Sequence, residues 1–177
     1  HGFDIAGTSV GYVKQDKIID GTRITESDVL IGLKSSGPHS NGYTLIRKLF
    51  DGDKELGKKL VEPTRIYVKE VMALIKQVNV HGIAHITGGG LDNISRINYN
   101  FKYVIDNPLP VPSIFDWLQE KGNIKDKEMY RTFNMGMGMV IVVSKDDAEK
   151  SVSILGKNAQ IVGKVTSGSG VTHKFTS

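Results

Sequence analysis

Short apolar segments alternate with segments of helical periodicity along most of the chain, and this alternation restricts the fold class. The segments that predict strands are 7–13, 29–34, 83–86, 102–106, 139–143, 160–166 and 171–176. The segments that predict helices begin at Tyr43 and cover 64–78, 91–97, 111–122 and 146–158. The sequence therefore predicts an α+β fold with α/β-type layers, in which helices cover a mixed β-sheet.

The 177 residues are enough for one domain with a substantial core. Neither an internal repeat nor a long low-complexity linker divides the sequence. We therefore expect a single domain over residues 1–177. The charged segment 51–62 is expected to be a mobile insertion in it.

The composition excludes several classes of protein. The chain has no cysteine, which excludes disulfides, thiolate catalysis and zinc–cysteine sites. Its longest strongly apolar run, 139–143, is far shorter than the roughly 20 residues that span a bilayer. We find no signal or transit peptide in the sequence and expect a cytoplasmic protein without a membrane partner.

The net charge of +4 is spread along the chain, with only small basic pairs such as Arg47–Lys48 and Lys58–Lys59. A nucleic-acid-binding protein more often has a basic stripe with interleaved aromatic residues. The charge suits anionic small molecules equally well, and no nucleic-acid partner is expected.

Two glycine-rich turns, "SSGPHSNG" at 35–42 and "TGGG" at 87–90, each follow an expected strand and precede an expected helix. The first amides of a helix lack internal partners and carry a partial positive charge. Because glycines also let a phosphate approach the backbone, this design suits an anion. Hydroxyl groups of Ser36, Ser40 and Thr87 would add donors.

Purely structural roles stay open for both turns. Ser40 or Asn41 also suits the N-cap of a helix, and 88–90 also suits a turn that needs positive φ angles. Neither turn has a Walker A lysine, and "GGG" is not the spaced dinucleotide fingerprint. A conventional P-loop or Rossmann nucleotide site is therefore not expected.

Two histidines accompany the turns. His39 lies inside the first turn, where an imidazole can donate to a phosphate or move a proton; an exposed histidine without a function is the alternative. His85 precedes the second turn on an expected strand, which favours a place in the core or behind the site. His81 and His173 have no such context, and no histidine spacing indicates a metal site.

The segment 131–143 carries Gly136 and Gly138 at the entry to a buried strand. This pattern implies a close backbone approach, either by another strand, which we prefer, or by a ligand. Arg131 and Asn134 are polar groups available beside it.

Several of these segments together resemble one enzyme family. They are, in chain order, "DIAGTSVG", "KIIDG", "DVLIGLKSSGPHSNGYTLIRK", "EPTRIYVKEV", "AHITGGGLDNISRI", "FDWLQEKGNI" and "EMYRTFNMGMGMVIVV". Over residues 3–143 the chain resembles the C-terminal half of phosphoribosylformylglycinamidine cyclo-ligase, also called aminoimidazole ribonucleotide synthetase. From residue 144 onward the match holds only in outline. The combination is far more specific than either glycine-rich turn alone.

The resemblance implies ATP-dependent ring closure of formylglycinamidine ribonucleotide to aminoimidazole ribonucleotide in de novo purine synthesis, a ligase reaction that forms a C–N bond. It also implies an enzyme of two α/β halves that forms a homodimer. ATP and Mg²⁺ would be bound mainly by an N-terminal half that this sequence does not contain. We therefore expect the isolated chain to lack turnover and to hold no metal ligand.

The resemblance also assigns site residues. Substrate- or phosphate-binding positions carry over onto Ser35, Ser36, Gly37, Ser40, Asn41, Gly42, Thr87, Gly88, Gly89 and Gly90. His39 is the implied catalytic residue, and His85 and Asn134 are expected behind the site. After "GGGL" the family usually has "ENIPR" or "ENLPR", where this chain has "DNISR".

Two alternatives stay open. Another ATP-using member of the same superfamily would keep the architecture with a different substrate, as in formylglycinamidine ribonucleotide synthase, selenophosphate synthetase, thiamine-phosphate kinase or a hydrogenase-maturation protein. The segments "HSNGYTLIRK" and "EMYRTFNMGMGM" favour the cyclo-ligase. A non-enzymatic nucleic-acid-binding module is the distant alternative, and the dispersed charge opposes it.

Overall fold

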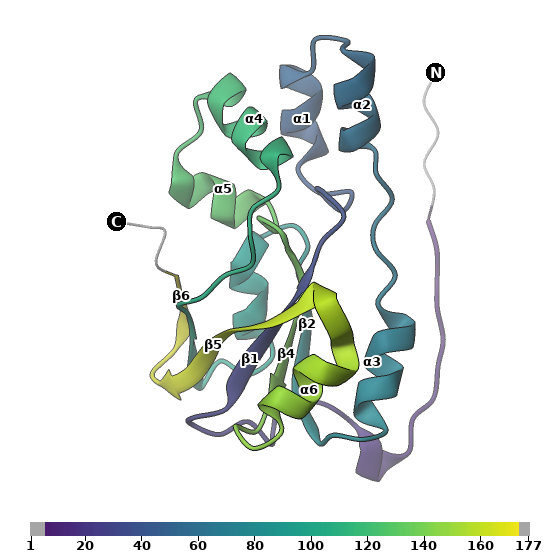
Figure 1. The fold of residues 1–177 in the computed structure, drawn as a ribbon, viewed down its shortest axis with the longest axis vertical. Helices are drawn as coiled ribbons and strands as arrows, with labels where there is room; N and C mark the ends of the chain where they lie inside the picture. The colour runs from purple at the N-terminus through teal and green to yellow at the C-terminus, as the bar shows by residue number, and fades with distance from the viewer. Residues whose placement is uncertain (1–5, 174–177) are drawn as a thin grey trace.

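A six-stranded mixed sheet forms the centre of the protein (Figure 1). The structure is a computed structural model that describes residues 6–173. Its strands are β1 (Val29–Lys34), β2 (Val80–His85), β3 (Phe101–Ile105), β4 (Met137–Val143), β5 (Ala159–Ser167) and β6 (Gly170–His173). They lie in the order β2-β4-β1-β5-β3-β6, and every neighbouring pair is antiparallel except β3 and β6. The predicted α+β class with a mixed sheet is confirmed.

The two strands with the longest buried apolar runs lie side by side within the sheet. Leu30 and Ile31 of β1 and Ile141 and Val142 of β4 are fully buried, and Ile31 pairs with Ile141. Successive side chains of a strand point to opposite faces, so consecutive buried residues mean that both faces are covered. The strands predicted at 29–34 and 139–143 are confirmed.

Helices cover both faces of this sheet. They are α1 (Tyr43–Leu49), α2 (Lys54–Leu60), α3 (Val68–Ile75), α4 (Ser113–Gly122), α5 (Asp126–Thr132), α6 (Ala148–Leu155) and the short 3-10 helices η1 (Gln15–Lys17), η2 (Gly90–Arg96) and η3 (Gly156–Asn158). The core on one face includes residues of α1, α4, α5 and η2, and the core on the other includes residues of α3 and α6. Figure 1 shows α1, α2, α4 and α5 gathered toward one end of the sheet.

The predicted first strand at 7–13 is wrong. This segment is extended but pairs with no strand in the part of the chain that the structure describes. Val10 and Tyr12 are almost completely exposed. An apolar, β-favouring segment forms a strand only where a neighbouring strand completes its hydrogen-bond ladder, and none lies beside it here.

Other segments also differ from the prediction. The segment 51–62, expected as an insertion, contains α2, whose N-cap Asp53 accepts a hydrogen bond from the backbone N–H of Leu56. Within 64–78 only α3 is α-helical, because residues 63–67 form no helix and Tyr67 is the N-cap of α3. Helix α5 was not predicted. The expected last strand appears as β6, and residues 174–176 of it lie outside the described part.

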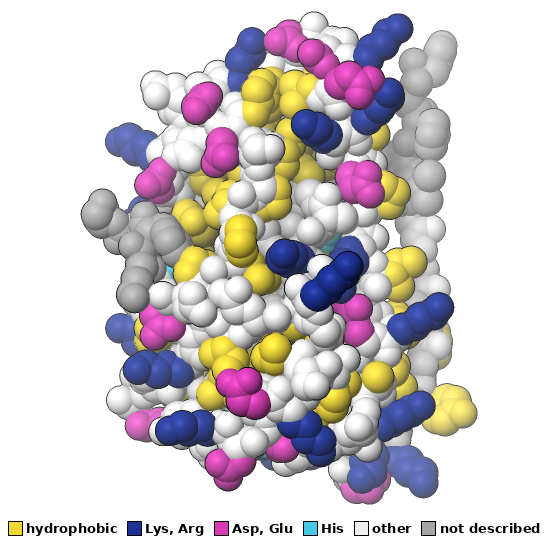
Figure 2. All heavy atoms as spheres, viewed as in Figure 1, with side chains coloured by type: hydrophobic (Ala, Val, Ile, Leu, Met, Phe, Trp, Pro, Cys, Tyr) yellow, Lys and Arg dark blue, Asp and Glu magenta, His cyan; other side chains and the backbone are white. Residues whose placement is uncertain are grey.

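The basic side chains of the described residues form no single cluster on the face of the molecule that Figure 2 shows. On the face shown in Figure 2, lysines and arginines are scattered among acidic and neutral residues. Within residues 6–173, no helix is long and apolar enough to cross a membrane.

Candidate anion-binding site

The two glycine-rich turns come together because of the strand order. β4 lies between β1 and β2 and is antiparallel to both. The ends of β1 and β2 therefore lie at the same end of the sheet as the start of β4. The chain leaves β1 into the first turn (35–42), leaves β2 into the second turn (87–90), and enters β4 through the loop 133–136, which we call the β4 entry loop.

Specific contacts join the first turn to the β4 entry loop. The backbone N–H of Ser35 donates to the carbonyl oxygen of Gly136 at 2.9 Å. The Asn134 amide Nδ2 donates to the carbonyl oxygen of Gly37 at 2.7 Å, and its Oδ1 accepts from the N–H of Gly136. Asn134 is buried, so it supports the first turn from behind. A side chain at Gly88 would touch the Asn41 amide oxygen, so the second turn lies against the first.

His39 is buried beneath the first turn, with 3% of its surface exposed. Its Nε2 accepts a hydrogen bond from the Ser36 backbone N–H at 2.9 Å. Burial, followed by the charges of His85 and Arg65, lowers the pKa of His39 from 6.5 to about 4. The imidazole is therefore neutral at pH 7, and because Nε2 accepts, the proton lies on Nδ1. In this arrangement His39 fixes the position of Ser36.

His39 should make the stability of the chain depend on pH. Between pH 6.5 and 4 the unfolded chain binds a proton at this residue that the folded chain does not bind. The resulting stabilisation is fully present above pH 6.5 and is lost as the pH falls toward 4. By pH 5 this group should have cost roughly 2 kcal/mol of the free energy of unfolding. Urea unfolding at pH 7.5 and pH 5 measures this loss.

A His39→Gln variant is the control for this measurement, because the other titrating groups remain in place. The variant is expected to be less stable at pH 7.5 but to lose less free energy of unfolding than the wild type between the two pH values. An identical pH dependence in both proteins would show that His39 is not held neutral by the fold.

The segment 63–67, which we call the strap, holds the first turn from outside. The Ser36 hydroxyl donates to the carbonyl oxygen of Pro63 at 2.7 Å. Arg65 Nη1 and the Tyr67 hydroxyl both donate to the carbonyl oxygen of Lys34, at 3.0 and 2.9 Å. The Arg65 guanidinium lies 5.0 Å from the centre of the Tyr67 ring.

The two side chains of the strap that bond to Lys34 have defined charge states. Arg65 forms an ion pair with both carboxylate oxygens of Glu70, at 2.8 and 3.0 Å, so its charge is already partnered. Burial raises the pKa of the Tyr67 hydroxyl, which stays a neutral donor. The sequence reasoning gave these residues no role, although they lie in the segment "EPTRIYVKEV" that contributed to the family resemblance.

The second turn is organised by Asn93, which lies in the segment "DNISR" that departs from the family's pattern and which was given no role from the sequence. Its Oδ1 accepts from both the backbone N–H and the hydroxyl of Thr87, at 2.8 and 3.0 Å, and its Nδ2 donates to the carbonyl oxygen of Gly88. The Thr87 hydroxyl is therefore occupied as a donor. Gly88 itself is exposed, so the outer side of the turn is open to a ligand.

Several sequence expectations about single residues are corrected by the structure. Neither Ser40 nor Asn41 caps α1; the N-cap is Gly42, in the left-handed conformation and without a side-chain hydrogen bond. His85 is exposed rather than in the core, although its ring centre lies 6.2 Å from that of His39. The group that approaches Gly138 is a pair of side chains, His39 and Tyr67, and not another strand.

The predicted binding residues differ in their exposure. Ser40 and Gly88 are exposed; Ser35, Ser36, Asn41, Gly42, Thr87 and Gly89 are half-buried; Gly37, His39 and Gly90 are buried. The Ser35 hydroxyl and the His39 Nδ1 are buried without a hydrogen-bond partner among the described residues. Within residues 6–173, no group of three or more His, Asp or Glu side chains could hold a metal ion.

Solved structures share this fold. The chain is similar to HypE of E. coli, a hydrogenase maturation protein, with a TM-score of 0.65 and 21% identity over 86% of this chain and 48% of that one. It is similar to HypE in complex with ATP, with a TM-score of 0.65 and 17% identity over 88% and 47%. It is also similar to thiamine-monophosphate kinase from Stenotrophomonas maltophilia, with a TM-score of 0.60 and 16% identity over 92% and 55%. The fold is thus that of one half of such proteins.

The family is identified by its model, described as "AIR synthase related protein, C-terminal domain", which matches residues 25–175. The chain belongs to this family. It spans about half the length of the solved structures named above.

Proposed function

We propose that this chain supplies one half of the active-site cleft of a phosphoribosylformylglycinamidine cyclo-ligase, the ATP-dependent ligase of purine biosynthesis. The observation that carries the proposal is the meeting of the two glycine-rich turns at one end of the sheet, in a chain of the AIR synthase related family. The segments "HSNGYTLIRK" and "EMYRTFNMGMGM" favour the cyclo-ligase within the family.

In the proposed reaction, ATP phosphorylates the formamide oxygen of formylglycinamidine ribonucleotide. An amidine nitrogen then attacks the activated carbon, closes the imidazole ring and releases phosphate. Such phosphoryl chemistry depends mainly on positioning and on electrostatic stabilisation of charged oxygens. The amides of Gly42, Gly88 and Gly89 and the Ser40 hydroxyl are suited to this task, because the amides and hydroxyls of Ser36 and Thr87 already donate within the protein.

His39 would act in this scheme as a positioning residue. Its buried, neutral ring holds the Ser36 amide, and a pKa of about 4 makes it a poor proton acceptor at neutral pH. Stabilisation of the transferring phosphoryl group would fall to the amides of the turn that His39 keeps in place.

Magnesium ion does not fit the described residues of this half, which offer no cluster of carboxylate or imidazole ligands. We place ATP and Mg²⁺ mainly in the N-terminal half of a complete protein, and that half would also complete the cleft. The complete protein would be a homodimer. HypE, whose fold is similar, has a structure in complex with ATP.

Activity measurements test the proposal. A complete protein that carries this domain should form aminoimidazole ribonucleotide from formylglycinamidine ribonucleotide and ATP, whereas the 177-residue chain alone should show no turnover. Thiamine monophosphate should not be phosphorylated by the complete protein. Phosphorylation of thiamine monophosphate without ring closure would instead assign the chain to the kinase type, an alternative that the similar fold of thiamine-monophosphate kinase supports.

A further inference from the structure

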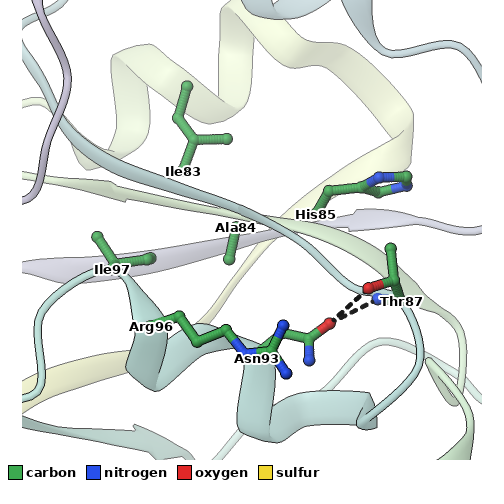
Figure 3. A pocket seen from close by; sticks show the side chains of 7 residues that line it. All are labelled: Ile83, Ala84, His85, Thr87, Asn93, Arg96 and Ile97. Atoms are coloured by element: carbon green, nitrogen blue, oxygen red, sulfur yellow. Dashed lines mark hydrogen bonds between the residues drawn. The ribbon is translucent and has the colours of Figure 1, made fainter. Parts of the chain in front are cut away.

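A cavity lies at the end of the sheet away from the two glycine-rich turns, between η1, the end of α3 and the start of β2. We call it the η1–α3 cavity; residues within 16–23 and 72–80 line it. Figure 1 shows η1 beside the last turn of α3, at the opposite end of the molecule from α1 and α2. The η1–α3 cavity has a volume of about 600 Å³, whereas the cavity beside the second turn (Figure 3) has about 210 Å³. Sites for small molecules measure roughly 300–1,000 Å³, so the η1–α3 cavity has the size of such a site.

One part of the lining is apolar. It consists of five residues from η1 onward, α3 and β2, namely Ile19, Met72, Ile75, Val78 and Val80. Val78 and Val80 are buried, whereas Met72 is 46% exposed, so the apolar part reaches the surface of the protein. The apolar body of a ligand would be removed from water on this part of the lining, which favours binding.

The rest of the lining carries an excess of positive charge. It includes three cationic residues, Lys17, Arg23 and Lys76, and one acidic residue, Asp16. Asp16 is paired with Lys17 at 3.8 Å, and both side chains are largely exposed. No ion pair involves Arg23 or Lys76 within residues 6–173. Two cations of the lining therefore remain available to an anionic group.

The backbone carbonyl groups around the cavity are already bonded to cationic side chains. Arg23 Nη2 donates to the carbonyl oxygens of Ile18 and Val80, at 3.3 and 3.1 Å, and Lys150 Nζ donates to that of Gln77 at 2.7 Å. A guanidinium has five N–H donors. Nη1 and Nε of Arg23 have no hydrogen-bond partner in the part of the chain that the structure describes, so they remain as donors for a ligand.

We propose that the η1–α3 cavity binds a small amphipathic anion. The apolar body of the ligand lies on the five apolar residues, and its carboxylate, sulfonate or phosphate group pairs with Arg23 and Lys76. Because the cavity and the glycine-rich turns lie at opposite ends of β2, this site is separate from the candidate anion-binding site and does not depend on the proposed reaction.

A second apolar cavity of the protein provides an internal comparison. It has a volume of about 380 Å³ and lies beside the strap and α3, where Ile66, Val68 and Val71 are among its lining residues. Its arginine, Arg65, is already bonded to both carboxylate oxygens of Glu70. This strap cavity therefore offers apolar surface without an available cation.

NMR titration of the 177-residue chain, labelled at its amides and methyl groups, tests the proposal. Two probes, 1-naphthoate and octanoate, separate an aromatic from an aliphatic ligand body. At least one of them should saturably shift the methyl signals of Ile19, Ile75 and Val78 and the amide signal of Asn79. The neutral analogue 1-naphthalenemethanol should bind about 10-fold more weakly than 1-naphthoate, because its charge-assisted hydrogen bonds are missing.

Three results would overturn the proposal. Neither anion shifts these signals saturably, or the neutral analogue binds as tightly as 1-naphthoate. In the third, the anions shift the methyl signals of Ile66 and Val71 in the strap cavity as strongly as those of the η1–α3 cavity, which would indicate adsorption to any apolar surface.

Matched variants test the charge at Lys76, which forms no hydrogen bond or ion pair to any residue that the structure describes. Lys76→Gln should weaken binding of the preferred anion about 3- to 5-fold, as expected for a partly solvated ion pair. Lys69→Gln removes the same charge from an exposed position on the same helix, outside the cavity, and should leave binding unchanged. Equal effects of the two variants would contradict a specific contact with Lys76.

The apolar part of the site is tested at Met72, where partial exposure lets a substitution be made without opening the core. Met72→Glu places a carboxylate beside the bound anion and should weaken binding about 10-fold or more, whereas Met72→Leu should retain it. Unchanged binding in Met72→Glu, with the variant folded by circular dichroism, would place the ligand elsewhere and overturn the proposal.

Discussion

A Gly90→Ala variant is expected to lose about 3 kcal/mol or more of folding stability. Gly90 has a φ angle of +56°, and a Cβ there would lie 1.9 Å from the carbonyl oxygen of Tyr130 and 3.0 Å from that of Phe133. A left-handed non-glycine residue costs about 1–3 kcal/mol, and overpacking adds about 1–3 kcal/mol. The obstructing atoms are backbone, so no rotamer change relieves the clash. Thermal unfolding should show a midpoint lower by about 6–12 °C.

Gly52→Ala is the matched control for the backbone strain alone. Gly52 has a φ angle of +96°, but nothing lies within 4 Å of a Cβ built on it. Its substitution should therefore cost only about 1 kcal/mol. Equal losses of folding stability in Gly90→Ala and Gly52→Ala would mean that the second turn does not pack against the end of α5 as the structure describes.

A Gly138→Ala variant is expected to displace the pair of side chains that fixes the first turn. The new Cβ would lie 2.0 Å from the Tyr67 hydroxyl oxygen and 2.5 Å from His39 Cε1. Overpacking of this kind costs about 1–3 kcal/mol, and displacement of His39 would also remove the acceptor of the Ser36 amide. Urea unfolding should show the loss of stability, and the Ser36 amide should exchange faster with solvent.

Two further variants make this result specific. Tyr67→Phe removes the nearest obstructing atom, so the double variant with Gly138→Ala should be less destabilised than the sum of the single changes. Gly11→Ala, where nothing lies within 4 Å, should change stability by less than about 0.5 kcal/mol. If the losses of stability caused by Tyr67→Phe and Gly138→Ala simply added in the double variant, the contact between Tyr67 and Gly138 would be contradicted.

Local patterns were enough to predict the elements that are buried on both faces. The continuous apolar runs at 29–34 and 139–143 leave few alternatives to inner strands. The sequence shows that the two glycine-rich turns share one design. That they come together follows from the strand order, since β1 and β2 end at the same end of the sheet.

Elements that depend on a distant partner were not predictable in the same way. The segment 7–13 has the composition of a strand but no neighbour in the described chain, and α5 carries only the adjacent Met129 and Tyr130 as buried residues, which is too short a pattern to recognise. The burial of His39 and its bond to the Ser36 amide depend on residues 63–67 and 138, far along the chain. A single sequence gives no measure of such contacts.

The most direct test of the central claim is a crystal structure of the 177-residue chain soaked with pyrophosphate. The claim is that the two glycine-rich turns form one anion-binding surface. The account predicts electron density for the anion within hydrogen-bonding distance of the amides of residues 40–42 or 88–89. Well-ordered pyrophosphate at the dispersed basic pairs 47–48 or 58–59, with both turns left empty, would contradict it.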